Sequence, residues 1–253
     1  MPVIPTFIEP HWPAPASVLA LSTTRLGGYS KAPFDSFNLG AHVEDNASDV
    51  ALNRKILCRA LPPEAAVSWL SQVHGTTVVE AQRDAPMPAA DAQWSRTPGL
   101  ACAILTADCL PVLLCSIKGD VVAAAHAGWR GLQAGVLEAT VASMDTNPEQ
   151  LIAWMGPVIG PIAFEVGAEV RDTFLASAEP SQAAATAACF VPSADHLGRY
   201  LADLGGLARV RLRTLGVTRV FGSGCCTYSD RARFFSYRRD GQTGRMASLI
   251  LLR

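Results

Sequence analysis

The chain has 253 residues, of which 49% are hydrophobic and 17% are charged, and its formal net charge is −1. This composition excludes extensive disorder and allows a large core, and the near-zero charge gives no indication of a nucleic-acid or membrane partner. Residues 1–25 show no secretory signal pattern and the seven cysteines are an odd number, so we expect reduced thiols and a cytoplasmic location.

In the first third of the chain, hydrophobic periodicity predicts short strands around one amphipathic helix. The helix covers residues 47–61, with Asn46 or Ser48 as its N-cap. The predicted strands lie at 18–25, 67–75 and 76–81. The Pro- and Ala-rich residues 85–92 are predicted to form a surface loop.

From residue 100 onward, strands and helices intermix. Three short apolar runs, 100–105, 110–117 and 121–125, are typical of a buried sheet. Further strands are predicted at 151–156, 217–222 and 246–252, and helices at 129–144, 166–176 and 200–216, with residues 178–188 as a surface excursion. Because no linker or repeat divides the chain, we expect residues 1–253 to form a single α/β domain with mixed sheets.

Three of these apolar strands carry a potential metal ligand at one end. His74 lies in SQVHG, Cys109 in LTADCLPVLL and His126 in AAAHAGWRG. Zinc accepts imidazole and thiolate together, and a catalytic zinc keeps three protein ligands with one open position. Their wide separation excludes a zinc finger and favours an active site. The alternative, that each is a packed core residue, stays open at this point.

Polar residues beside these candidates suit chemistry on an anionic group. Arg130 and Gly131 follow His126 at the expected start of a helix, where backbone N–H groups favour an anion. Gly128 and Gly131 are equally typical of tight turning. Asp108, next to Cys109, is a candidate proton-transfer carboxylate, or alternatively a turn residue at the sheet edge.

Seven blocks of the sequence, running from about residue 20 to the C-terminus, resemble the YfiH-type laccase-domain family, also called multicopper polyphenol oxidase. The blocks are TTRLGG, SFNLG, SQVHG, LTADCLPVLL, AHAGWRG, GPVIGPIAFEVGAEV and CCTYSDRARFFSYRRDGQTGRMASLILL. The resemblance implies a four-layer α/β/β/α fold and a His–Cys–His zinc site at His74, Cys109 and His126. Phe164 departs from the family pattern, which has Tyr there, and a contact of that hydroxyl with substrate would be missing.

The same resemblance implies purine nucleoside chemistry: phosphorolysis of adenosine, inosine, guanosine and methylthioadenosine, and deamination of adenosine. The partners would then be a small nucleoside and phosphate. Candidate substrate contacts are Arg25, Arg130, Glu165 and Cys226. For Arg25 an exposed turn arginine is the alternative, and for Glu165 an acid favouring a helix N-terminus.

Copper is a less favoured cofactor than zinc. A multicopper oxidase needs about ten imidazoles, several in His-x-His pairs, and the chain has five histidines and no such pair. A mononuclear blue copper would need a weak axial methionine, and no motif nominates one.

Residues 199–253 contain eleven arginines, which taken alone suggests nucleic-acid binding. The stretch FFSYRRDGQTGR suits equally the stacking of one purine ring and the holding of one phosphate. A small ligand is favoured because the chain as a whole is near neutral.

Two other functions stay open. One is a cysteine hydrolase with Cys109 as nucleophile and His126 or His74 as base, since the family's fold is similar to that of a toxin deamidase with a Cys–His pair. The other is an editing factor in cell-wall precursor metabolism, a role that the resemblance also implies.

Overall fold

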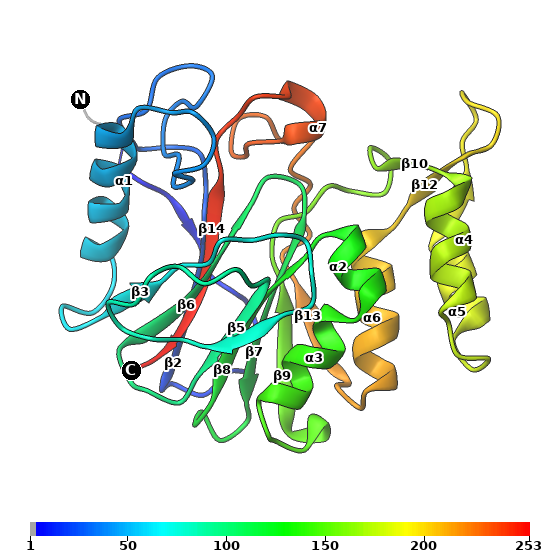
Figure 1. Cartoon of the computed structure of the whole chain (residues 1–253), viewed down its shortest axis with the longest axis horizontal. Coiled ribbons are helices and arrows are strands. Elements are labelled where there is room, and N and C mark those ends of the chain that lie inside the picture. Colours follow the sequence, from blue (N-terminus) through cyan, green and yellow to red (C-terminus); the bar gives the residue numbers. More distant parts are fainter. Residues whose placement is uncertain (1–3) are drawn as a thin grey trace.

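The computed structural model describes residues 4–253, and its layers run helix, sheet, sheet, helix (Figure 1). The first sheet has the strand order β1-β2-β14-β6-β3. Its strands are β1 Phe7–Ile8, β2 Val18–Thr23, β3 Ala66–Ser68, β6 Leu100–Thr106 and β14 Met246–Leu252. The second sheet has the order β13-β9-β7-β8-β5-β4. Its strands are β4 Val78–Glu80, β5 Ala92–Ser95, β7 Leu110–Ser116, β8 Val122–Ala127, β9 Leu151–Met155 and β13 Arg219–Gly222.

Both sheets are mixed. The pairs β3–β6, β4–β5 and β9–β13 are parallel, whereas β14 pairs antiparallel with β2 and β6, and β7 with β8 and β9. Strands β6, β7, β8 and β14 are buried along their whole length. They are predominantly apolar, as the sequence predicted, because each sheet is covered on both faces.

Three hydrophobic clusters join the layers. The cluster between the sheets includes Ile104 of β6, Leu113 of β7 and the fully buried Trp154 of β9. On the outer face of the first sheet lies α1, Ala47–Arg59, which begins at the N-cap Asn46 and buries Leu57. The outer face of the second sheet is covered by α2 Trp129–Ala134, α3 Val136–Ser143 and α6 Leu204–Thr214. The predicted α/β fold is therefore confirmed, with four layers.

A small unit lies beyond this second helical layer, at the right of Figure 1. It is a three-stranded sheet with two helices: β10 Glu165–Gly167, α4 Ala168–Ala176, α5 Ala183–Ala188, β11 Phe190–Pro192 and β12 Arg199–Ala202. The remaining short elements are η1 Pro148–Gln150 and α7 Tyr237–Asp240. None of the helices in residues 4–253 combines the length and apolar character needed to cross a bilayer.

The helix predicted over 129–144 is in fact two helices. Gly135 lies between them with φ 105°, a left-handed conformation that ends α2 and redirects the chain into α3.

The prediction of a helix over 200–216 places its start too early, because the observed helix α6 begins at Leu204. The first residues of the predicted range belong to β12, and the helix starts after Asp203, whose side chain accepts a hydrogen bond from the Gly206 N–H. The predicted excursion 178–188 contains α5, and the predicted strand 67–75 ends at Ser68, after which the chain turns through His74 with φ 61°. In each case a local cap or turn overrides the hydrophobic pattern.

Candidate functional site

His74, Cys109 and His126 converge at one end of the two sheets. Each offers one ligand atom, and these atoms all lie within 4.8 Å of one another. His74 comes from the loop after β3, Cys109 from the turn directly before β7 and His126 from the end of β8. The distance from Cys109 Sγ to His74 Nε2 is 3.9 Å. Three side chains far apart in the sequence thus share a space of the size that one metal ion needs.

Two glycines of the AHAGWRG block allow this approach. A Cβ at Gly128 would lie 3.0 Å from His74 Cδ2 and 3.1 Å from Cys109 Sγ, so any larger residue would intrude on the cluster. A Cβ at Gly131 would lie 2.8 Å from the Gly75 carbonyl oxygen. The glycines therefore do more than turn the chain: they let the start of α2 pack against the loop that carries His74.

Asp91, which the sequence analysis did not single out, organises the cluster. Its side chain is fully buried, and Oδ1 accepts hydrogen bonds from His126 Nδ1 at 2.8 Å and from the His74 N–H at 2.9 Å. Its Oδ2 accepts from the N–H groups of Val73 and Gly75. This carboxylate stabilises the left-handed turn at His74 and directs His126 Nε2 toward Cys109, as partners of metal-binding histidines commonly do.

The charges of the cluster favour a thiolate. Burial opposes ionisation of Cys109, but the imidazoles of His126 and His74 lower the pKa of its thiol to about 6. Burial likewise opposes protonation of His126, but Cys109 and Asp91 raise the pKa of its imidazole to about 9. A cation in the midst of these groups would be stabilised by the same negative charges.

The cluster opens into a cavity of about 430 Å³. His42, Gln72, Thr106, Tyr237 and Arg245 contribute to its walls, together with Leu105, Ala107 and the three cluster residues. Gln72 fixes one wall, because its side-chain amide exchanges two hydrogen bonds of 2.8 Å with the backbone of Leu105. The volume lies in the range of small-molecule binding sites.

Asp108 is not among the residues that line this cavity. It is buried, and its carboxylate accepts hydrogen bonds from Thr227 Oγ1 at 2.6 Å, Ser236 Oγ at 3.0 Å and the Arg238 N–H at 2.7 Å. These contacts tie the turn before Cys109 to the C-terminal segment. The geometry fits the alternative reading of Asp108 as a structural turn residue, and proton transfer by Asp108 stays a prediction.

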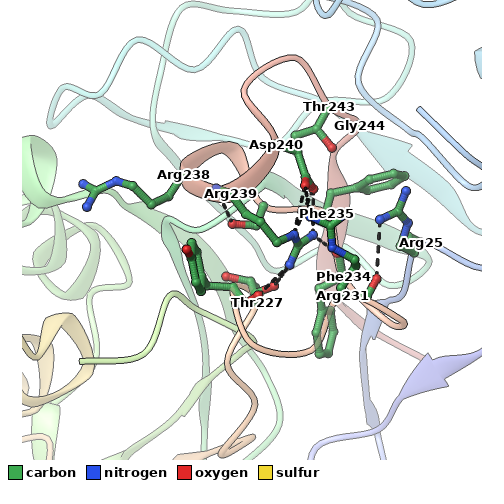
Figure 2. Close-up of polar contacts among 12 residues, drawn as sticks. Arg25, Thr227, Arg231, Phe234, Phe235, Arg238, Arg239, Asp240, Thr243 and Gly244 are labelled. Atoms are coloured by element: carbon green, nitrogen blue, oxygen red, sulfur yellow. Dashed lines mark hydrogen bonds and ion pairs between the residues drawn. The ribbon is translucent and has the colours of Figure 1, made fainter. Parts of the chain in front are cut away.

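Arginines of the C-terminal segment mostly hold the segment itself together. Arg239 donates to the carbonyl oxygens of Thr227 at 2.8 Å and Phe234 at 2.8 Å, and it pairs with Asp240 (Figure 2). Arg238 donates to the Glu165 carbonyl oxygen at 2.9 Å. These two guanidinium groups are held by the protein's own backbone, and the preference for a small ligand over a nucleic acid stays a prediction.

The predicted anion contacts Arg25 and Arg130 do not line the cavity. Arg25 pairs with Asp35 at 3.2 Å, and its guanidinium lies over the Phe235 ring and donates to the Arg231 carbonyl oxygen (Figure 2). Arg130 is exposed and lies over the Trp129 ring, 4.5 Å from its centroid. Their binding of substrate stays a prediction.

Glu165 and Cys226 also lie outside the cavity walls. Glu165 is in β10, not directly before a helix, and its carboxylate accepts from Ser193 Oγ at 2.7 Å and contacts His196. Cys226 lines a second cavity of about 430 Å³ beside α6 and accepts from the Gly160 N–H at 3.1 Å. Phe164 is buried in the core under the second helical layer and does not line the cluster's cavity. The effect of its missing hydroxyl on substrate binding stays a prediction.

The fold and the cluster together define a class of four-layer α/β proteins with a possible metal site between strand ends. A family described as multi-copper polyphenol oxidoreductase laccase matches residues 19–253, and the chain belongs to this family. It is 57% identical over 246 residues to purine nucleoside phosphorylase PA4543 of Pseudomonas aeruginosa, covering 97% of this chain and 98% of the relative. It is 52% identical over 246 residues to purine nucleoside phosphorylase YfiH of Escherichia coli, with the same coverage.

Solved structures agree with the fold. Protein NMB0706 of Neisseria meningitidis is 48% identical and superimposes with a TM-score of 0.90, covering 97% of this chain and 98% of that one. The YfiH protein of Bacillus licheniformis is 30% identical, with a TM-score of 0.84 and 93% of each chain covered. The predicted family resemblance is confirmed.

Proposed function

We propose that this protein is a zinc-dependent purine nucleoside phosphorylase. The observation that carries the proposal is the convergence of His74, Cys109 and His126 at the wall of a cavity of about 430 Å³. The relatives named purine nucleoside phosphorylase, at 57% and 52% identity over nearly the whole chain, support the reaction class. A cytoplasmic location belongs to the same proposal.

Zinc fits the donor set better than copper does. Two imidazoles and one thiolate are ligands that zinc prefers, and the hydrogen bond from His126 Nδ1 to Asp91 leaves Nε2 for the metal. No methionine is among the residues lining the cavity within the described chain, so the axial ligand of a blue copper site is missing. Five histidines are too few for a multicopper centre. Bound zinc would supply a fixed positive charge that polarises an oxygen of phosphate or substrate.

The remaining cavity residues would bind and orient the nucleoside. Tyr237 is 62% exposed at the cavity wall, and the Arg245 guanidinium lies over its ring, 5.9 Å from the centroid. We expect the exposed part of this ring to stack on a purine. Gln72 holds the wall formed by Leu105 and so keeps the loop that carries His74 in place. In phosphorolysis, a bond from a phosphate oxygen to C1′ of the ribose forms as the glycosidic C–N bond breaks. The departing base takes up the proton that the attacking phosphate gives up. The products are the free base and ribose 1-phosphate, or 5-methylthioribose 1-phosphate when the substrate is methylthioadenosine.

We propose adenosine, inosine, guanosine and methylthioadenosine as the substrates of phosphorolysis, and deamination of adenosine as a second activity of the same cavity. The shared purine ring is the reason to expect one binding site for all four. Sites built to contact the ring and not its exocyclic groups discriminate weakly among purines.

The test is incubation of zinc-loaded protein with adenosine, inosine and methylthioadenosine, with and without inorganic phosphate, followed by chromatography of the products. Release of free base that depends on phosphate is expected, and inosine formed from adenosine would establish deamination. Protein with bound zinc that converts none of the three nucleosides would contradict the proposal.

Chelation separates this proposal from a cysteine hydrolase. The lowered pKa of Cys109 and the raised pKa of His126 are also features of a Cys–His catalytic pair. A hydrolase of that kind keeps its activity after zinc is removed, whereas the phosphorylase is expected to lose it. An editing factor for cell-wall precursors would instead show cell-wall defects that persist when His74 is changed and nucleoside turnover is lost.

A further inference from the structure

One cationic side chain faces the cavity of the cluster without a carboxylate partner. Arg245, directly before β14, is the single Lys or Arg among the residues that line this cavity, and no Asp or Glu is among them in the described chain. No carboxylate of residues 4–253 forms a salt bridge with it. Its Nη1 donates to the carbonyl oxygens of Thr243 and Gly244, at 2.8 and 3.1 Å. Nε and Nη2 donate no hydrogen bond within the same part of the chain.

The SFNLG block holds Arg245 in this position. Asn38 is fully buried, and its Oδ1 accepts from the Arg245 N–H at 2.8 Å, while the Leu39 N–H donates to the Arg245 carbonyl oxygen. Gly40 makes room for the side chain, because a Cβ there would lie 2.8 Å from Arg245 Cγ. A segment more than two hundred residues earlier in the sequence therefore fixes both the backbone and the stem of this arginine.

The guanidinium of Arg245 is partly desolvated and is not fully compensated by its neighbours. Burial lowers its pKa, and the charges of Cys109 and Asp108 offset only part of this effect. A desolvated cation of this kind is stabilised further by a bound anion. Burial and the charges of Arg245 and Arg54 lower the pKa of His42 on the same wall. Thr243, which lines the adjoining cavity shared with His42, Tyr237 and Arg245, has a buried hydroxyl without a hydrogen-bond partner in the described chain. Such an atom is costly unless a ligand supplies the partner. Glu44 also lines that adjoining cavity, where its carboxylate accepts a hydrogen bond from Gln242 Nε2 at 3.1 Å.

We propose that Arg245 is the anion-binding residue of this cavity and that its ligand is a phosphate group, either inorganic phosphate or the phosphate of a nucleotide. A guanidinium matches two oxygens of a tetrahedral phosphate in a bidentate pair, which a lysine cannot do. The choice of phosphate rests on the proposed phosphorolysis. Arg245 would then hold the second substrate, phosphate, beside the cluster. This is the role that the sequence predicted for Arg130 and Arg25.

The test is a calorimetric titration of zinc-loaded protein with inorganic phosphate and, in a separate arm, with adenosine monophosphate. The Arg245→Gln protein is expected to bind phosphate about 10- to 100-fold more weakly. In Arg245→Lys, which keeps the charge, the loss is expected to be smaller, and this variant decides the matter if the glutamine protein does not fold. Arg171→Gln, at an exposed arginine paired with Asp172, is the matched control and is expected to bind phosphate as the parent does.

Unchanged phosphate binding in both Arg245 variants, or its loss in Arg130→Gln instead, would overturn the assignment. Binding of adenosine monophosphate alone, weakened by Arg245→Gln, would support the anion site and identify a nucleotide as the source of the phosphate. The two proposals fail separately. If phosphate binding depends on Arg245 but the protein converts no nucleoside, only the phosphorylase function is contradicted. If the protein converts nucleosides but the Arg245 variants bind phosphate as the parent does, only the role of Arg245 is contradicted.

Discussion

Cys109→Ser is expected to lower the zinc affinity by at least about 100-fold and to abolish phosphate-dependent release of base from inosine. A serine hydroxyl stays protonated near neutral pH and is a poor zinc ligand, and loss of a direct ligand should exceed the 10- to 100-fold effect of losing a ligand's hydrogen-bond partner. Because the cluster side chains lie within 4.8 Å of one another, the smaller oxygen would leave two imidazoles to hold the ion. Zinc content after dialysis against a graded zinc buffer measures the effect.

Cys58→Ser is the matched control for this change. Cys58 is an exposed thiol on α1, on the far side of the first sheet, and its replacement is expected to leave zinc affinity and turnover at the parent level. If Cys109→Ser kept the parental zinc content, Cys109 would not be a zinc ligand. If it kept parental turnover, the thiolate would not be needed for the reaction.

Asp91→Asn should weaken zinc binding by about 10- to 100-fold and lower the free energy of unfolding. The carboxylate uses both oxygens, with four hydrogen bonds from His126 Nδ1 and the N–H groups of Val73, His74 and Gly75. An amide replaces one oxygen by a donor, so at least one buried N–H loses its acceptor, at a cost of about 1–3 kcal/mol for each such group. Zinc competition with a chromogenic chelator and denaturant unfolding of the same preparation measure the two effects.

Asp120→Asn provides the comparison, because Asp120 is an exposed carboxylate that accepts one short hydrogen bond from Ser116 in the turn after β7. We expect zinc affinity to be unchanged in that variant. Equal zinc affinities for the Asp91 and Asp120 variants would show that Asp91 stabilises the turn at His74 but does not contribute to zinc binding. An unchanged unfolding midpoint for Asp91→Asn would contradict the assigned hydrogen bonds.

Two members of the cluster were accessible from the sequence because Cys109 and His126 stand at the ends of apolar runs, whereas His74 follows the short strand β3 in a turn. Such runs mark buried strands, and a polar residue at their end faces the edge of the sheet. The family blocks then narrowed the candidates to His74, Cys109 and His126. Burial alone would have left each of them as a packed core residue.

Asp91 was missed because its signal depends on strand pairing. In the sequence it falls within the Pro- and Ala-rich stretch 85–92, which is predicted as a surface loop. That prediction is wrong at the end of the stretch, where Ala90, Asp91 and Ala92 are fully buried. Asp91 reaches His126 because β5 and β8 pair antiparallel with Ala92 opposite Ala125. Periodicity predicts the apolar strand that ends before His126, but it predicts neither the short strand β5 nor the register in which the two pair.

Arg245 was hidden for a related reason. It is one of eleven arginines near the C-terminus, and the others mostly bind backbone carbonyls or acids. What distinguishes Arg245 is its contact with Asn38, at a sequence separation of 207 residues. The helix boundaries at Gly135 and Asp203 were in principle readable from the sequence, since a glycine and an aspartate are the residues expected at a helix end and start.

Zinc X-ray absorption spectroscopy of the purified protein tests the metal site most directly. We expect one zinc per chain, with one sulfur neighbour at about 2.3 Å and nitrogen neighbours at about 2.0–2.1 Å. The sulfur signal should be absent from any zinc retained by Cys109→Ser. A zinc shell of nitrogen and oxygen alone in the parent protein, or fully folded protein that binds no zinc, would contradict a site built from His74, Cys109 and His126.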